Sequence, residues 1–442
     1  MIVFTQHKEE IVLNDKALSS GGEGEIHAIT KPSERFRNCC AKIYYLKKRT
    51  SLQKEKIKYM VNNPPSIVRN NNFMLGWPIE YITDREGNFI GFIMPLAFND
   101  SKQLVMLTTT KVSKKLNEYW HYRYSRNFRQ YSTLSRLKLL CNIAVPIHIL
   151  HSTNKYVIKD LKPENILITY DGKVTIVDMD SIQISEQGKL LYPGTAATPN
   201  YIPPEYYALK NKETRLDTSW DDFALGVIFY QVLIGLHPYV LTPCDIEENA
   251  TNEIYSNIAK FLFPFGEKQN QIQGYPPIHN NFKELPTKIQ QLFMRTFSCD
   301  IKHRPTAQEW GESLYEAAKA NVIVRTPHLL GSYVCPTCKR KIEVLEDDVL
   351  IYDSARIRIE NKIKIFPNNT YVFNGRTITV LNHCPYDNIL TIPEQKFLEQ
   401  EQKNKVTIDK EPTKKQGDDN NGCGIIIGII LFIGLIILLT CL

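Results

Sequence analysis

Hydrophobic and polar positions divide the first 320 residues into β-rich and helical stretches. Ile11 and Leu13 alternate with polar residues and predict a strand, which leads into a glycine-rich segment at 18–26. An apolar run follows at 39–44, and residues 52–61 have the pattern of a helix. Two more strands are predicted within residues 77–95, on either side of a turn at 84–88.

The pattern changes after residue 330. Residues 331–392 alternate β-branched and polar residues, notably at 355–359 and 362–365, which predicts short strands. Residues 393–422 are rich in charge and poor in large apolar groups, so we expect them to form a flexible polar tether.

Residues 423–442 read CGIIIGIILFIGLIILLTCL and carry no charge. A helix of this length would span about 30 Å, the thickness of the hydrocarbon core of a bilayer. We therefore expect a single-pass C-terminal membrane anchor, with residues 1–422 in the cytoplasm. Gly424 and Gly428 form one pair of small residues, which would allow dimerisation through this helix, although glycines are common in membrane helices.

Composition and charge narrow the function classes. The chain has 442 residues, of which 43% are hydrophobic, and this excludes wholesale disorder. Its net charge of +7 is small and spread along the chain, so nothing in it favours a nucleic acid partner. Ten cysteines are too few for a disulfide scaffold, and the N-terminus has no basic stretch followed by an apolar run, as a signal peptide would.

A first group of candidate binding residues surrounds the glycine-rich segment. Glycines there would let backbone amides approach an anion, because a Cβ atom would hold them away. Lys42 lies in the apolar run at 39–44, where a lysine needs an anionic partner. Glu55 is one candidate for that partner, although the lysines around it also fit a solvated helix surface.

A second group combines two acids, a lysine and an amide. Asp160, Lys162 and Asn165 precede a turn at 171–172 and a strand at 174–177, and Asp178 follows that strand. Asp160 can orient and deprotonate a hydroxyl, and Lys162 can neutralise a moving phosphoryl group. Asn165 and Asp178 offer the oxygen ligands that Mg²⁺ prefers. The second group therefore predicts a metal–phosphate site.

These segments resemble the eukaryotic-type serine/threonine protein kinase family, including a bacterial branch of it. Residues 160–165 (DLKPEN) match the catalytic loop of that family, and the step of thirteen residues from Asn165 to Asp178 also fits. Residues 198–205, 221–227 and 304–307 resemble later family motifs in the same order. The resemblance implies an α+β, two-lobed kinase fold over residues 1–320, with a β-rich N-lobe at about 1–97 and a helical C-lobe at about 98–320.

The resemblance also implies an activity and roles for individual residues. It implies that γ-phosphoryl groups pass from ATP, with Mg²⁺, to Ser or Thr hydroxyls of a protein substrate at the cytosolic face of a membrane. The residues expected to bind the nucleotide are Ser19, Gly21, Gly22, Gly24, Ile26, Lys42, Glu55, Met94, Leu96, Asn165 and Asp178. Adenine would meet the backbone near 95–97, Thr198 would lie beside Asp160, and Arg304 would pair with Glu205.

Four positions depart from the family pattern. Ile158 and Lys159 stand where the family has His-Arg, and a lysine lacks the planar fork with which arginine binds phosphate, so control by activation-loop phosphorylation is in question. Asp180 replaces the glycine after the metal-binding Asp, which predicts a less mobile loop, and Ser19 replaces the first loop glycine. None removes a group expected to touch phosphoryl or metal. A catalytically silent, nucleotide-sensing scaffold tethered to a membrane is the alternative.

The cysteines at 331–392 suggest a zinc-ribbon-like module. Cys335 and Cys338 have the two-residue spacing of zinc knuckles, and the return pair would be Cys384 with Asp387 or His383. An aspartate stands where a standard ribbon has its last cysteine. A ribbon that has lost its metal and packs these thiols as small apolar groups is the alternative.

Overall fold

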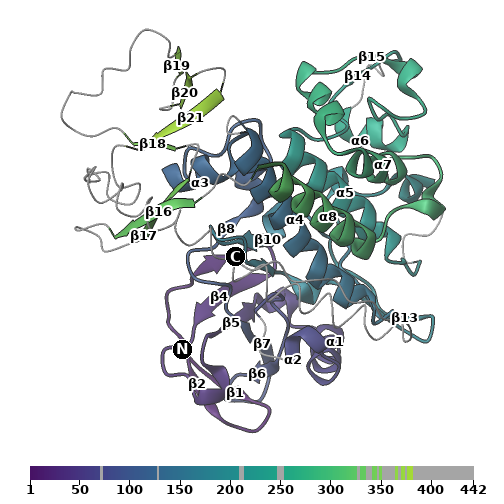
Figure 1. The fold of residues 1–442 in the computed structure, drawn as a ribbon. Coiled ribbons are helices and arrows are strands. Elements are labelled where there is room, and N and C mark those ends of the chain that lie inside the picture. Colours follow the sequence, from purple (N-terminus) through teal and green to yellow (C-terminus); the bar gives the residue numbers. More distant parts are fainter. Residues whose placement is uncertain are drawn as a thin grey trace, which may run out of the picture. The chain divides into compact units, whose positions relative to one another are not determined.

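The computed structural model divides into two compact units (Figure 1). The larger unit is formed by residues 1–115 and 124–318, and the smaller includes residues 116–123 and the described residues from 319 onward. The structure describes residues 1–69, 73–126, 129–208, 214–245, 253–325, 329–334, 341–345, 348–350, 364–366, 370–373 and 376–381.

A curled seven-stranded sheet forms the first lobe of the larger unit, with the strand order β2-β1-β6-β7-β5-β4-β3. All of the pairings between neighbouring strands are antiparallel. The strands are β1 Ile2–Thr5, β2 Glu10–Val12, β3 Ser19–Ser20, β4 Gly24–Ala28, β5 Cys39–Tyr44, β6 Glu80–Thr83 and β7 Phe89–Pro95.

Burial explains why β5 and β7 lie in the interior of this sheet. Six consecutive residues of β7, from Phe89 to Met94, are buried, which is the pattern of a strand covered on both faces. Helix α1 (Ser51–Asn62) packs against β6 and β7. This helix begins where the Thr50 hydroxyl caps it by accepting a hydrogen bond from the Gln53 amide at 3.1 Å.

Helices dominate the second lobe of the larger unit. Nearly every residue of α5 is buried, as expected for a helix that is apolar all round, and it ends at Gly235, whose φ of 93° suits glycine. The helices outside the first lobe are α3 Glu118–Tyr124, α4 Arg129–His151, α5 Ser219–Ile234, α6 Glu253–Ala259, α7 Thr287–Thr296 and α8 Ala307–Arg325; α2 is Ser66–Arg69.

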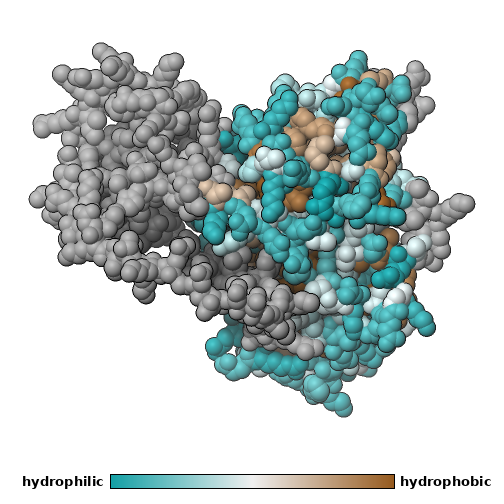
Figure 2. All heavy atoms as spheres, turned by 45° about the vertical axis from the view of Figure 1, so that its right-hand side comes forward, coloured by the Kyte–Doolittle hydropathy of each residue, from teal (hydrophilic) through white to brown (hydrophobic). Residues whose placement is uncertain are grey.

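The described part of the chain holds one helix that is long and apolar enough to cross a membrane. It is Ser132–His151, within α4, and most of it is buried among other parts of the protein. This burial is what a core helix of the second lobe requires. On the face drawn in Figure 2, the described residues are mostly hydrophilic, with hydrophobic residues gathered in smaller patches.

The second lobe contains three small sheets, and the candidate site residues lie next to the first two of them. Their strand orders are β11-β10-β8, β13-β12-β9 and β14-β15. The strands are β8 Lys102–Gln103, β9 Tyr156–Val157, β10 Ile166–Ile168, β11 Val174–Ile176, β12 Gln183–Glu186, β13 Lys189–Tyr192, β14 Thr242–Pro243 and β15 Ile272–Gly274.

The predicted ion pair between Arg304 and Glu205 is confirmed. Two guanidinium nitrogens of Arg304 donate to the two carboxylate oxygens of Glu205 at 2.8 and 3.0 Å, and one also donates to the Ser219 carbonyl at 2.8 Å. Because this arginine side chain is 1% exposed, the pair ties residues 99 positions apart in a largely desolvated place.

The smaller unit contains a two-stranded and a four-stranded sheet. Their orders are β16-β17 and β18-β21-β20-β19, and β18 pairs with β21 in parallel. The strands are β16 Leu329–Val334, β17 Lys341–Leu345, β18 Asp348–Leu350, β19 Lys364–Phe366, β20 Thr370–Phe373 and β21 Arg376–Leu381. The candidate zinc ligands Cys335, Cys338, Cys384 and Asp387, with His383, lie outside the described residues, as do the expected tether and membrane anchor.

Candidate active site

The glycine-rich segment forms the hairpin between β3 and β4. Gly21 and Gly22 are exposed at its turn, and a Cβ atom on either would meet nothing within 4 Å. Gly24 is buried, and a Cβ there would lie 2.2 Å from the Ile43 carbonyl oxygen. Ile26 pairs with both Ser19 and Lys42 across the sheet, so this hairpin lies directly beside the strand that carries Lys42.

Lys42 lies at the centre of a group of carboxylates. Its Nζ donates to Asp178 Oδ1 at 2.9 Å and to both carboxylate oxygens of Asp180 at 2.8 Å, and it lies 3.9 Å from Glu23 Oε2. One carboxylate oxygen from each of Glu23, Asp178 and Asp180 lies within 4.8 Å of the other two. The Lys42 ammonium is therefore the cation that these three carboxylates surround.

Glu55 is not the partner of Lys42, which corrects one expectation from the sequence. Its side chain is 56% exposed and pairs with Lys58 at 3.1 Å, one turn away on the same helix. The residues that α1 buries are Lys56, Ile57 and Met60. Because α1 packs through these residues, Glu55 lies on its solvent side. Glu55 is thus part of a solvated helix surface, the alternative that the sequence left open.

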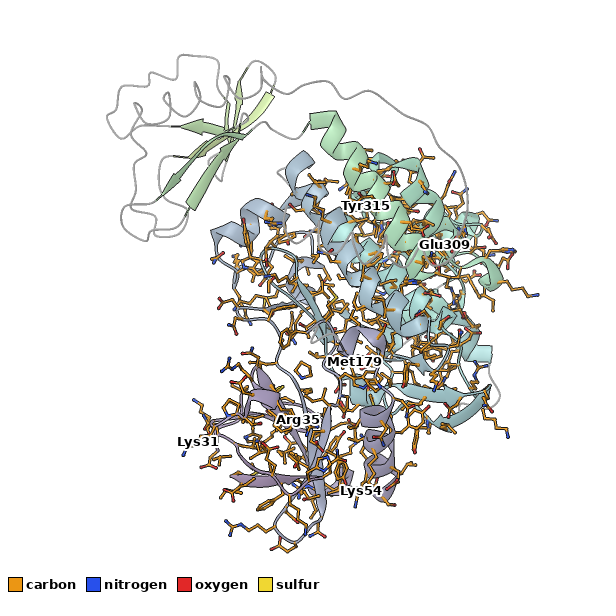
Figure 3. The ribbon with its side chains drawn as sticks, turned by 60° about the horizontal axis from the view of Figure 1, so that its bottom comes forward. Lys31, Arg35, Lys54, Met179, Glu309 and Tyr315 are labelled. Carbon is orange, nitrogen blue, oxygen red and sulfur yellow. The ribbon has the colours of Figure 1, made fainter. Side chains whose placement is uncertain are left out.

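Charge and burial give Asp178 and Asp180 different properties. Burial raises the pKa of Asp178, and its side chain remains 34% exposed. Burial would also raise the pKa of Asp180, but the Lys42 ammonium and its hydrogen bonds hold that pKa below the usual value. Asp180, at 1% exposed, is thus the enclosed counter-ion of Lys42, whereas Asp178 keeps access to a ligand. Figure 3 labels Met179, which separates the two and lies where the lobes meet.

Asp160, Lys162 and Thr198 form a single hydrogen-bonded group. Lys162 Nζ donates to Asp160 Oδ2 at 2.6 Å and to the Thr198 hydroxyl at 3.0 Å, and that hydroxyl donates to Asp160 Oδ1 at 2.6 Å. Thr198 comes from a segment 38 residues later in the chain, as the resemblance implied. The group offers a carboxylate, a hydroxyl and a cation at one place.

The loop before Asp160 is held by a residue whose role the sequence did not reveal. Asp221, at the start of α5, accepts hydrogen bonds from the Ile158 amide at 2.7 Å and the Lys159 amide at 2.8 Å. Trp220 donates its indole N–H to the Lys159 carbonyl at 2.8 Å. These bonds stabilise Lys159 at a φ of 66°, a conformation that is unfavourable for a lysine.

Asn165 and Asp178 are brought together by backbone and side-chain bonds. The side-chain nitrogen of Asn165, Nδ2, donates to the Asp160 carbonyl at 3.0 Å. The side-chain oxygen of Asn165 is therefore the atom left for a metal. The Asn165 carbonyl accepts the Val177 amide at 2.9 Å, next to Asp178. One amide oxygen and one accessible carboxylate form a set of hard ligands that fits Mg²⁺.

The segment expected to meet adenine continues from β7. Met94 is 8% exposed and pairs with Cys40 of β5. The Leu96 amide donates to the Asn38 carbonyl at 2.9 Å, so that amide is already engaged. The Leu96 N–H is therefore not available to a ligand in this structure.

Lys159 makes a contact of its own with the segment after β13. Its Nζ donates to the Gly194 carbonyl at 2.7 Å. A Cβ on Gly194 would lie 2.6 Å from the Lys159 Cδ atom, so the lysine stem passes directly over this glycine. The lysine that replaces the family's arginine thus binds a neutral backbone group of the same chain.

Comparison with known proteins was consistent with this geometry. The family described as "Protein kinase domain" matches residues 91–315, just over half of the chain; the match begins after Lys42 and the glycine-rich hairpin. "Protein kinase YegI" of Escherichia coli K12 is 28% identical over 353 residues, covering 76% of this chain and 50% of that protein. "Citron rho-interacting kinase" of Rattus norvegicus is 30% identical over 126 residues, or 28% of this chain and 6% of that protein.

The chain spans about half the length of the Escherichia coli relatives that it matches; for the O157:H7 protein of the same name the share is 44%. A solved structure titled "ROP18 kinase domain in complex with AMP-PNP and sucrose" is 13% identical, with a TM-score of 0.47, and the match covers 73% of this chain and 86% of that one.

Gly24→Ala should destabilise the hairpin and the strand that carries Lys42. The new Cβ would collide with the Ile43 backbone, and overpacking of this kind costs about 1–3 kcal/mol in the free energy of unfolding. Gly21→Ala is the matched control, because its Cβ would meet open space. Denaturant unfolding of the full chain measures both, and equal stability of the two variants would contradict the packing argument.

Proposed function

The chain belongs to the protein kinase family, and on this premise we propose that it transfers the γ-phosphoryl group of ATP to serine or threonine hydroxyls of a protein. The observation that carries the proposal is the hydrogen-bonded group of Asp160, Lys162 and Thr198. Lys162 follows the catalytic acid by two residues, as in the serine/threonine branch of the family. The Thr198 hydroxyl marks where the hydroxyl of a substrate would meet Asp160.

In the proposed reaction, Asp160 accepts the proton of the substrate hydroxyl while the oxygen of that hydroxyl forms a bond to the γ-phosphorus. The bond from that phosphorus to the bridging oxygen breaks, and ADP leaves with its electron pair. Lys162, whose ammonium already lies between Asp160 and Thr198, neutralises charge on the phosphoryl group as it moves.

The residues that would hold ATP and Mg²⁺ come from both lobes. Asn165 and Asp178 would bind the metal, which neutralises phosphate charge when present. Lys42 would bind the α- and β-phosphates, with the amides of the 18–26 hairpin above them, and Met94 and Leu96 would contact the base. Asp180 keeps Lys42 oriented before any ligand arrives.

Asp160→Asn should abolish most of the transfer and leave nucleotide binding intact. The amide cannot accept the proton, and loss of a positioned base costs on the order of 10²–10⁴ in rate. The measurement is transfer of labelled phosphate from ATP with Mg²⁺ by the full chain, to itself and to a basic carrier protein. Phosphoamino-acid analysis should find phosphoserine or phosphothreonine.

The matched control is Asp245→Asn, which changes an exposed carboxylate after β14 and should retain the full rate. Unchanged transfer by Asp160→Asn would sink the assignment of the base. If the unaltered chain binds nucleotide but transfers to no protein, the silent scaffold replaces the proposed kinase.

We further propose that residues 423–442 attach the chain to a membrane, which would place the reaction at the cytosolic face. The support is an uncharged apolar run of twenty residues. The full chain, expressed in cells, should sediment with membranes through a carbonate wash, and a chain ending at residue 422 should be released. Equal partitioning of both chains would contradict the proposal.

A zinc ion held by Cys335, Cys338 and Cys384, with Asp387 or His383 as the fourth ligand, is a separate proposal that rests on the cysteine spacing. The purified full chain should contain about one zinc per molecule, and Cys335→Ser with Cys338→Ser should lose it. Cys244→Ser changes an exposed cysteine elsewhere and is the control. A stably folded chain without zinc would rule out the site.

A further inference from the structure

Protein kinases generally orient the strand lysine with a carboxylate from a helix. In this chain α1 packs against β6 and β7 and reaches the strand that carries Lys42 through Gln53, which donates to the Tyr44 hydroxyl, and one of the three side chains that α1 buries is a lysine. Lys56 is 2% exposed, whereas the acid next to it, Glu55, pairs with Lys58 at the surface. Helix α1 therefore supplies a positive charge where a negative one is usual.

Asp180 supplies the missing carboxylate from the loop after β11. Both of its oxygens accept from Lys42 at 2.8 Å, and Oδ2 also accepts from the Tyr44 hydroxyl at 2.5 Å. Gln53 of α1 donates to the same hydroxyl at 2.7 Å. The helix thus reaches Asp180 through two neutral side chains, Gln53 and Tyr44.

The buried Lys56 ammonium makes no hydrogen bond with any residue that the structure describes. The carboxylates of Asp180, Glu23 and Asp178 attract it. Burial lowers its pKa to about 8, against the pull of those carboxylates. A buried ammonium with no partner is costly unless the surrounding charge compensates it.

The charges around Lys42 balance when two differences from the usual kinase arrangement are counted together: Asp180 in place of a glycine, and Lys56 in place of a helix carboxylate. Glu23 pairs with Lys48 at 3.0 Å, which leaves the carboxylates of Asp178 and Asp180 as two negative charges against Lys42 and Lys56. A glycine at 180 would leave two ammonium groups with one carboxylate. A carboxylate at 56 beside Asp180 would leave three negative charges around Lys42.

We propose that Asp180 and Lys56 are an exchanged pair: Asp180 is the positioning residue of Lys42 in place of a helix carboxylate, and Lys56 balances the charge that Asp180 adds. The proposal rests on the proposed function for its effect on phosphoryl transfer, but its effect on nucleotide binding is independent of transfer. It makes the orientation of Lys42 a property of the loop at 178–181 rather than of α1.

The test is a double-mutant cycle in the full chain with Asp180→Gly, Lys56→Glu and the two combined. Each single variant should lose roughly 10²-fold in the rate of transfer. Asp180→Gly removes the carboxylate that orients Lys42, and Lys56→Glu places a third negative charge around it. The combined variant restores the usual arrangement and should recover at least tenfold over either single change. Lys58→Met, on the exposed side of α1, is the matched control and should leave the rate unchanged.

Affinity for a fluorescent ADP analogue and the melting temperature are measured on the same variants. Recovery of binding and rate together in the combined variant supports the exchange. A combined variant no better than the worse single one, with either readout, overturns it. If a single variant does not fold, the double variant with Lys56→Met and Asp180→Asn, which removes both charges, should have a higher melting temperature than that single variant. A melting temperature no higher than that of the single variant also overturns the exchange.

These readouts separate the two proposals. If the unaltered chain transfers no phosphate, the proposed function fails, and the cycle is read from nucleotide affinity alone. If the unaltered chain transfers phosphate and Asp180→Gly retains its rate and affinity, the proposed function stands and the exchanged pair does not.

Discussion

The arrangement of the candidate site depends on one buried ion pair, between the Lys42 ammonium and the Asp180 carboxylate. Three hydrogen bonds of 2.8–2.9 Å from Lys42 to Asp178 and Asp180 join the sheet lobe to the loop after β11, across more than 130 residues of sequence. Because both partners are removed from water, loss of either would leave an uncompensated buried charge, which costs far more than an exposed pair. The interaction therefore fixes Asp178 next to the glycine-rich hairpin.

A second constraint holds the catalytic loop in a conformation that its own sequence disfavours. Lys159 has a positive φ, and the carboxylate of Asp221 compensates by accepting the two consecutive amides at 158 and 159. Asp221 is completely buried, so these bonds replace the water that it has lost. Asp160 follows directly, and its carboxylate reaches Lys162 and Thr198 only because the preceding turn is set in this way.

The sequence predicted those parts of the fold and the site that depend on local spacing. Asp160, Lys162 and Asn165 precede β10, and Asp178 follows β11. The turn between these two strands returns the chain, so it brings Asp178 back toward Asn165. The sequence did not predict which of Glu55 and Lys56 α1 buries, because the two are adjacent and only packing against β6 and β7 decides between them. The bond from Lys42 to Asp180 spans 138 residues, and the engagement of the Leu96 amide by Asn38 likewise depends on tertiary structure.

Two of the departures from the family pattern, Lys159 and Asp180, have a common physical effect. In protein kinases, the placement of a helix carboxylate and the phosphorylation of a loop control whether the strand lysine and the catalytic loop are in place. Here Lys42 meets Asp180, which is two residues from Asp178, and Lys159 meets the Gly194 carbonyl at 2.7 Å. Both contacts are made to the loop region itself, at the Asp180 carboxylate and at the Gly194 backbone. The positions of Lys42 and Lys159 are therefore each tied to the chain between Asp178 and Gly194, so a change in the conformation of that segment would act on both lysines.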